Sequence, residues 1–103
     1  MLYVTIEVLQ DDIDRALRGR RYRARPATFC PVARAACRAL GLALGNVKVG
    51  GRSISIWGWQ DQDFLCVATT KKLERAVTRF DREKQMQPDR FRIKLTPSPV
   101  QGG

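Results

Sequence analysis

The two ends of the chain carry the same alternating pattern, and this constrains the fold more than any other feature. The segments LYVTIEVL, residues 2–9, and RFRIKL, residues 90–95, both alternate apolar side chains with more polar ones. Alternation of this period, rich in β-branched residues, is typical of strands with one buried face. The acid Glu7 would also attract basic outward residues such as Arg92 across neighbouring strands. We therefore predict that these two segments are adjacent strands of one sheet.

Three segments between the terminal strands have the pattern of helices. The first begins near Asp11, a candidate N-cap, and is closed by Gly19. In CPVARAACRALG, Pro31 stands where a first helical residue is expected and Gly41 supplies the stop. The third helix is predicted to run through about Arg82. Its apolar residues recur at helical spacing: Leu73, Ala76, Val77 and Phe80.

A hairpin is predicted in the middle of the chain. Gly50-Gly51 separates two alternating stretches, NVKV and SISIW, and such a pair is typical of a two-residue hairpin turn. A further apolar run, FLCVA, extends this meander. The order strand, helix, helix, three strands, helix, strand predicts an α+β fold with a mainly antiparallel sheet of about five short strands. We expect one domain at residues 1–95 and a flexible tail at 96–103.

Charge is distributed very unevenly along the chain. The net charge is +9, and 14 of the 19 basic residues are arginine. Residues 1–14 carry four acids and no base, whereas residues 15–60 carry ten bases and no acid. The remaining residues, 61–103, carry nine bases and six acids. A long segment of one sign repels itself, so we expect it to meet a negatively charged partner.

Composition excludes several kinds of chemistry. The chain has no histidine, which removes histidine-dependent acid–base and nucleophilic catalysis. Cys30, Cys37 and Cys66 form no CxxC motif and cannot alone supply the usual four zinc ligands. Cys30 and Cys37 would lie about 10 Å apart along a helix, beyond disulfide reach. We expect no enzymatic activity, no metal, no cofactor and no disulfide.

The thiol of Cys30 allows two interpretations. At the start of a helix a thiol can have a lowered pKa and become reactive. The alternative is that it is buried as a small apolar residue, which is the common fate of a free cysteine. We favour burial.

The densest part of the basic segment is GRRYRARP, residues 19–26, with four arginines and one tyrosine. Guanidinium groups suit phosphate geometry, and a tyrosine ring can stack on a base or sugar. The alternative is a solvated loop whose arginines are neutralised by acids of the first helix or of residues 61–89. On the first interpretation the candidate contact residues are Arg18, Arg20, Arg21, Tyr22, Arg23, Arg25, Arg34, Arg38, Arg52, Trp57 and Trp59.

Trp57 and Trp59 lie two residues apart, so in a regular strand both would point to the side opposite Ile54 and Ile56. They would then form either a second small core beneath the third helix or an exposed aromatic pair. An exposed pair would suit single-stranded nucleic acid or a groove on a protein.

Several of these features together resemble a group of small phage-encoded proteins of unassigned function. The resemblance covers roughly residues 4–95 and is carried by the opening strand, CPVARAA, VKVGG, VTRFDR and PDRFRIKL. The chain departs from the group in its longer arginine loop and in the additional hairpin WGWQDQDFLCVA. The resemblance implies a shared fold and a phage or prophage setting. It supplies no catalytic or binding residues.

These observations favour a non-catalytic, phage-type accessory protein that binds nucleic acid, or a host nucleoprotein complex, through its arginine-rich surface. Two alternatives remain: a protein-binding inhibitor of a host enzyme or defence system, of the anti-CRISPR type, and a small structural component of a virion. The chain has no run of about 18 apolar residues and no signal segment. We therefore expect a protein of the host cytoplasm without a membrane partner.

Overall fold

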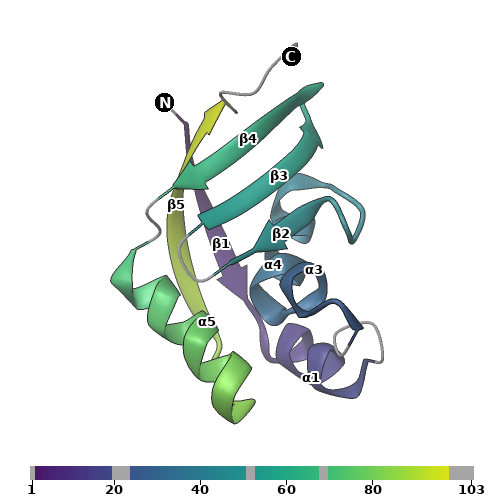
Figure 1. The fold of residues 1–103 in the computed structure, drawn as a ribbon, viewed down its shortest axis with the longest axis vertical. Helices are drawn as coiled ribbons and strands as arrows, with labels where there is room; N and C mark the ends of the chain where they lie inside the picture. Colours follow the sequence, from purple (N-terminus) through teal and green to yellow (C-terminus); the bar gives the residue numbers. More distant parts are fainter. Residues whose placement is uncertain (1, 20–23, 51–52, 68–69, 98–103) are drawn as a thin grey trace.

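The two alternating ends of the chain lie side by side in one sheet (Figure 1). Strand β1 (Leu2–Val8) pairs antiparallel with β5 (Asp89–Pro97) along its whole length. This confirms the predicted adjacency, although the register sets Glu7 opposite Arg90 rather than Arg92. The structure is a computed structural model that describes residues 2–19, 24–50, 53–67 and 70–97.

Three further strands complete the sheet. They are β2 (Val47–Val49), β3 (Ser53–Trp59) and β4 (Gln62–Val67), and the strand order is β1-β5-β4-β3-β2 with every neighbouring pair antiparallel. The pairing of Val49 with Ile54 confirms the predicted hairpin, but not a two-residue turn at Gly50-Gly51, which would have paired Val49 with residue 52. Because β5 pairs with both β1 and β4, it joins the strands of the middle of the chain to those of its two ends.

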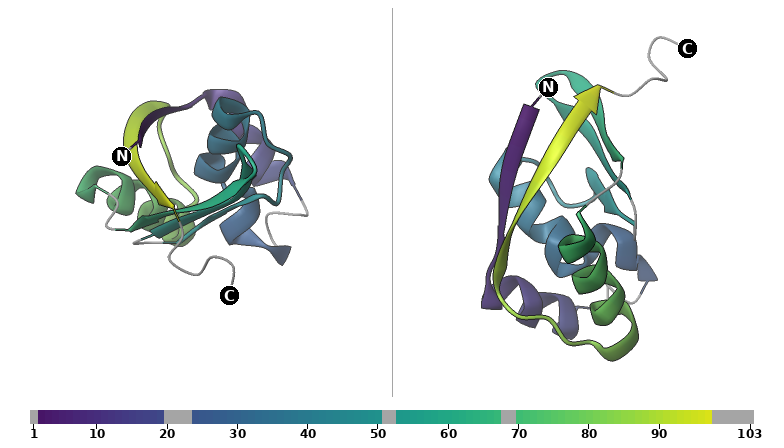
Figure 2. Two further views of the ribbon diagram at one scale, coloured as in Figure 1. Left: turned by 90° about the horizontal axis from the view of Figure 1, so that it is seen from above. Right: turned by 90° about the vertical axis from the view of Figure 1, so that its left-hand side faces the viewer.

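The predicted helices are present as α1 (Gln10–Arg18), α4 (Pro31–Leu40) and α5 (Lys71–Glu83), which confirms the α+β class. The described part of the chain also contains a one-turn helix that the sequence did not predict, α3 (Pro26–Phe29). Figures 1 and 2 show a strongly curled sheet. Helices α1, α3 and α4 lie together on one side of the molecule, and α5 lies on the other side.

Helix α4 lies against both edges of the sheet, because it contacts β1 and β2. Its small side chains permit this close approach: Val32, Ala33 and Ala36 have no exposed surface. The main core lies between this helix and the inward faces of the strands. It contains Ile6, Val8, Val47, Ile54, Ile56, Phe91, Ile93 and Leu95, and α5 adds Leu73, Val77 and Phe80.

The last strand is longer than the sequence predicted. Strand β5 continues through residues 96 and 97 instead of stopping at Leu95. The rest of the predicted flexible tail, 98–103, lies outside the described residues.

Strand β3 is irregular near its end, and this separates the two tryptophans. The register between β3 and β4 shifts between Ile56 and Trp59, and Gly58 has a φ of 74°. Trp59 consequently packs against the core, with its ring centroid 5.3 Å from that of Phe64, whereas Trp57 is 40% exposed. The prediction that the two share a face was therefore wrong, because a bulge interrupts the alternation on which it depended.

Replacing Gly58 tests whether this left-handed residue fixes the bulge. A β-branched side chain is strongly disfavoured at positive φ, whereas asparagine tolerates it. We expect Gly58→Val to lower the free energy of unfolding by about 2 kcal/mol and Gly58→Asn to lower it by clearly less. Urea unfolding followed by tryptophan fluorescence measures both. Equal stability of the two variants would contradict the assignment.

Candidate functional site

The carboxylate of Asp12 is buried and binds Arg38 in a bidentate ion pair. The two nitrogens of the guanidinium lie 2.6 and 2.8 Å from its oxygens, and the Asp12 side chain is only 4% exposed. The backbone N–H of Leu9 donates to the same carboxylate at 2.9 Å. Helix α1 thus begins after Leu9 with Asp12 accepting at its first turn, and the predicted capping by Asp11 was wrong.

Arg38 also holds the edge of the sheet. Its Nη2 donates to the carbonyl oxygen of Glu7 at 2.7 Å, so this edge carbonyl of β1 has a partner. Hydrogen bonding to Asp12 raises the pKa of Arg38 above its ordinary value. Arg38, predicted as a binding residue, is therefore already engaged within the fold.

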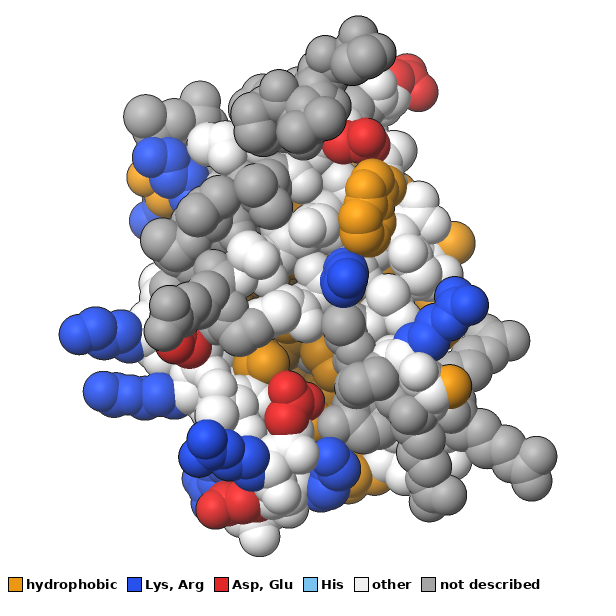
Figure 3. Space-filling view, viewed as in Figure 1, with side chains coloured by type: hydrophobic (Ala, Val, Ile, Leu, Met, Phe, Trp, Pro, Cys, Tyr) orange, Lys and Arg blue, Asp and Glu red, His pale blue; other side chains and the backbone are white. Residues whose placement is uncertain are grey.

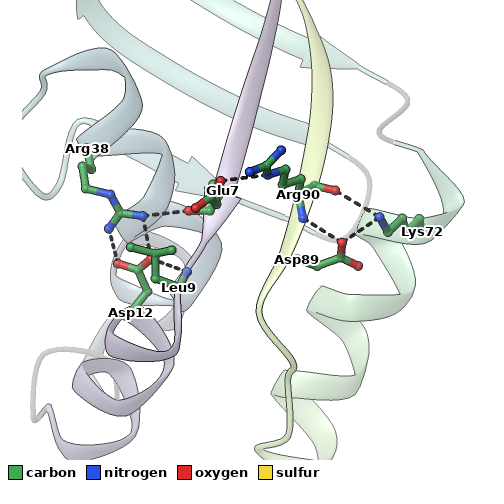
Figure 4. Close-up of polar contacts among 7 residues, drawn as sticks. All are labelled: Glu7, Leu9, Asp12, Arg38, Lys72, Asp89 and Arg90. Carbon is green, nitrogen blue, oxygen red and sulfur yellow. Dashed lines mark hydrogen bonds and ion pairs between the residues drawn. The ribbon is translucent and has the colours of Figure 1, made fainter.

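The same network continues across β1 and β5 to α5 (Figure 4). The Glu7 carboxylate lies 2.8 Å from Nε of Arg90. Lys72 donates to Asp89 at 2.9 Å and to the carbonyl oxygen of Arg90 at 3.0 Å. The hydrogen bond from Lys72 also lowers the pKa of Asp89. Ion pairs and hydrogen bonds thus connect α1, α4, β1, β5 and α5.

Two other bases of residues 15–60, the acid-free segment, lie on α1 itself and contact residues one turn earlier. Arg15 lies 2.8 Å from Asp11 in an exposed pair, and Nε of Arg18 donates to the carbonyl oxygen of Asp14 at 3.3 Å. Acids of the first helix therefore neutralise Arg15 and Arg38. The alternative interpretation concerned the arginines of residues 19–26, of which residues 20–23 lie outside the described residues.

Arg18, whose contact is to a backbone carbonyl, has no acidic partner within the described residues, and neither have the remaining described bases of this segment. Arg25 precedes α3 and is exposed, Lys48 is exposed on β2, and Arg34 is half-buried in α4. Both helices contact β2, and they also contact each other. Three unpaired bases are therefore carried by neighbouring elements at one edge of the sheet. We call Arg25, Arg34 and Lys48 the unpaired bases.

An exposed tryptophan lies next to Lys48. Lys48 is opposite Ser55 in the β2–β3 ladder, and Trp57 follows two residues later on the outward side. Such diagonal neighbours on one face lie roughly 7–8 Å apart. Figure 3 shows a hydrophobic side chain beside a basic one over these strands. The predicted Arg20, Arg21, Tyr22, Arg23 and Arg52 lie outside the described residues.

Another group of outward residues, which the local sequence pattern did not reveal, lies on β1 and β5. Tyr3 is 51% exposed, and the guanidinium of Arg92 lies over its ring. Alternation alone places both side chains on the outward face. Their proximity depends on the register between β1 and β5, which connects residues far apart in the sequence.

The described cysteines are buried thiols. Burial raises the pKa of Cys30 to about 11, and it also raises the pKa of Cys37. Cys30 Sγ accepts from the N–H of Ala33 at 3.4 Å and so caps α4. Neither thiol forms a disulfide. Burial of Cys30 is confirmed, and a reactive thiol of lowered pKa is not present at this helix start. Cys66 has no described side chain.

Comparisons with known proteins leave the chain without an assigned relative. No family model matches it, and no curated protein or solved structure matches it. Within the part of the chain that the structure describes, no group of three or more acidic or cysteine side chains is placed to hold a metal ion. None of its described helices is long and apolar enough to cross a membrane.

The Asp12–Arg38 pair makes a direct prediction about stability. Arg38→Ala leaves a buried carboxylate without its charged partner, and we expect the free energy of unfolding to fall by about 2 kcal/mol. The control is Arg15→Ala, which breaks an exposed pair and costs less than about 0.5 kcal/mol. Denaturant unfolding measures both variants. Equal losses would contradict a structural role for Arg38.

The buried thiol of Cys30 predicts a dependence of stability on alkaline pH. Above pH 9 the thiol ionises in the unfolded chain but stays protonated in the folded chain up to about pH 11. Its contribution to stability is therefore complete below pH 9 and falls by about 1.4 kcal/mol per pH unit above it.

Cys30→Ser keeps a capping acceptor but does not ionise. We expect the stability difference between the wild type and this variant to shift by about 2 kcal/mol, to the disadvantage of the wild type, between roughly pH 8 and 10.5. Cys37 is present in both proteins, so its effect cancels. A difference that is constant with pH would refute the assignment.

Proposed function

We propose that this chain is a non-catalytic accessory protein, of the phage type suggested by its sequence, that binds nucleic acid through an arginine-rich surface. The observation that carries the proposal is the division of charge within the acid-free segment. Arg15 and Arg38 are paired with acids of α1, whereas Arg25, Arg34 and Lys48 have no acidic partner among the described residues. Arg34 and Lys48 lie on α4 and β2, and Arg25 directly precedes α3; these three elements contact one another.

Electrostatics explains why such a group favours a polyanion. Bases without internal partners keep their full charge at the surface, where the phosphates of a polyanion can approach them. Arginine and lysine contacts to phosphates supply affinity and position a protein without reading sequence. The exposed ring of Trp57 beside Lys48 adds a surface on which a base can stack.

The state of the thiol of Cys30 and the contacts of three carboxylates also support a binding role. The chain lacks histidine, and burial keeps the thiol of Cys30 protonated at neutral pH. The carboxylates of Glu7, Asp12 and Asp89 each have a basic partner in the network of Figure 4. These acids serve the fold, which supports a function that depends on the remaining basic surface.

The test measures how salt affects binding to a mixed-sequence oligonucleotide. Replacing Arg25, Arg34 and Lys48 together by alanine should weaken binding to all sequences alike. The log–log salt slope should become shallower by about two units, because each lost phosphate contact accounts for roughly 0.7 to 0.9. Fluorescence anisotropy across a salt series gives both quantities.

A matched variant on the opposite side of the molecule controls for net charge. Lys71, Arg75 and Arg82 are exposed on α5, and their replacement by alanine removes the same charge. This variant should keep most of the affinity and the slope of the wild type. Equal weakening by both variants would contradict the proposed surface. A wild-type protein that binds no oligonucleotide would refute the function and leave a protein target, or a place in a virion, as the alternative.

A further inference from the structure

The outward face of the β1–β5 pair carries a second basic and aromatic group. Tyr3 lies opposite Lys94, and Arg92 lies opposite Thr5 in the antiparallel register. The guanidinium carbon of Arg92 is 4.3 Å from the centroid of the Tyr3 ring. This contact connects the two ends of the chain. It is also distant in sequence from the acid-free segment.

This group differs in charge balance from the neighbouring pair on the same face. Arg90 is bound to Glu7, whereas Arg92 and Lys94 have no acidic partner among the described residues. The three bases alternate along β5, so their side chains form one row on the outward face of the strand. Beyond the Glu7–Arg90 pair, this row continues with Arg92 and Lys94. The exposed Tyr3 ring lies beside them on β1.

The contact with Tyr3 restricts the guanidinium of Arg92. A guanidinium over an aromatic ring is stabilised by the cation–π interaction, and the ring limits the positions that it samples. Its surface away from the ring can stack on a base, and its N–H groups can bind phosphate. Lys94, next in the row, supplies a further positive charge for the backbone.

We propose that the Tyr3–Arg92–Lys94 face binds single-stranded nucleic acid by stacking an unpaired base and holding the adjoining phosphates. Charge complementarity and the exposed aromatic ring favour this occupant over a duplex, in which the faces of the bases are covered by their neighbours. The proposal rests on the proposed nucleic-acid function. It adds a second surface and a preference for the single strand.

The test compares a fluorescent oligothymidylate with a mixed-sequence duplex of equal length. Tyr3→Ala removes the ring, and Arg92→Lys keeps the charge but loses the planar group. We expect each to weaken binding of the single strand by roughly tenfold and to leave duplex binding unchanged within error. Tyr3→Phe keeps the ring, and Arg75→Lys makes the same exchange on α5. These two controls should bind both probes as the wild type does, and circular dichroism checks that all variants fold alike.

The outcomes separate this proposal from the proposed function. If the wild type binds the single strand and both Tyr3→Ala and Arg92→Lys bind it equally well, the stacking face is refuted and the function stands. If both variants weaken binding of the single strand and the duplex equally, the preference for the single strand is refuted. A third outcome is that the triple alanine variant of Arg25, Arg34 and Lys48 binds as the wild type does, while Tyr3→Ala and Arg92→Lys weaken binding of the single strand. The surface of the unpaired bases is then refuted, and the Tyr3–Arg92–Lys94 face stands. A wild type that binds neither probe refutes both.

Discussion

A single buried carboxylate, Asp12, organises the contacts among the first helix, the first strand and the helix that lies against both sheet edges. It accepts from the backbone of Leu9, where β1 passes into α1, and from the guanidinium of Arg38 on α4. Because Asp12 is almost completely buried, its charge needs these partners, and its position fixes α4 against α1. Arg38 in turn reaches the carbonyl oxygen of Glu7, which places the edge of β1.

Ion pairs such as Asp12–Arg38 determine which basic residues remain without an acidic partner at the surface. Three of the four acids of the first fourteen residues form ion pairs within the fold, with Arg15, Arg38 and Arg90, and the fourth, Asp14, accepts from the side chain of Gln10. The bases that remain without acidic partners among the described residues include Arg25, Arg34 and Lys48 of the acid-free segment. Others lie on β5, where Arg92 and Lys94 share a face with Tyr3. The structure therefore divides the described basic residues into a group with acidic partners in the fold and a group without them.

The sequence predicted the elements well where one local pattern determined them. Alternation at both ends predicted the β1–β5 pair, Gly50-Gly51 predicted a hairpin, and Pro31 marked the start of α4. Alternation could not reveal the bulge at Gly58, because one residue of left-handed conformation changes the direction of every side chain after it. It was also silent on α3, a single turn too short to show helical periodicity.

The candidate site was less accessible to sequence reasoning. Asp12 and Arg38 are 26 residues apart, and nothing in their local patterns showed that they meet. An unpaired and an ion-paired arginine look alike in a sequence, so Arg38 was grouped with Arg25 and Arg34. The separation of these residues required the positions of α1 and α4. In the same way, Tyr3 and Arg92 became neighbours only through the register of the terminal strands.

The division between ion-paired and unpaired basic residues can be tested by two-dimensional NMR. Isotope-labelled protein is titrated with a single-stranded oligonucleotide, and the signals that shift identify the contact surface. Backbone amide signals report on each non-proline residue, and arginine Nε–H and tryptophan indole signals report on individual side chains. We expect progressive shifts at Arg25, Arg34, Lys48 and Trp57 and at Tyr3 and Arg92, with little change at Arg15 and Arg38. Shifts centred on the ion-paired arginines or on α5, or a spectrum unchanged by the oligonucleotide, would contradict this expectation.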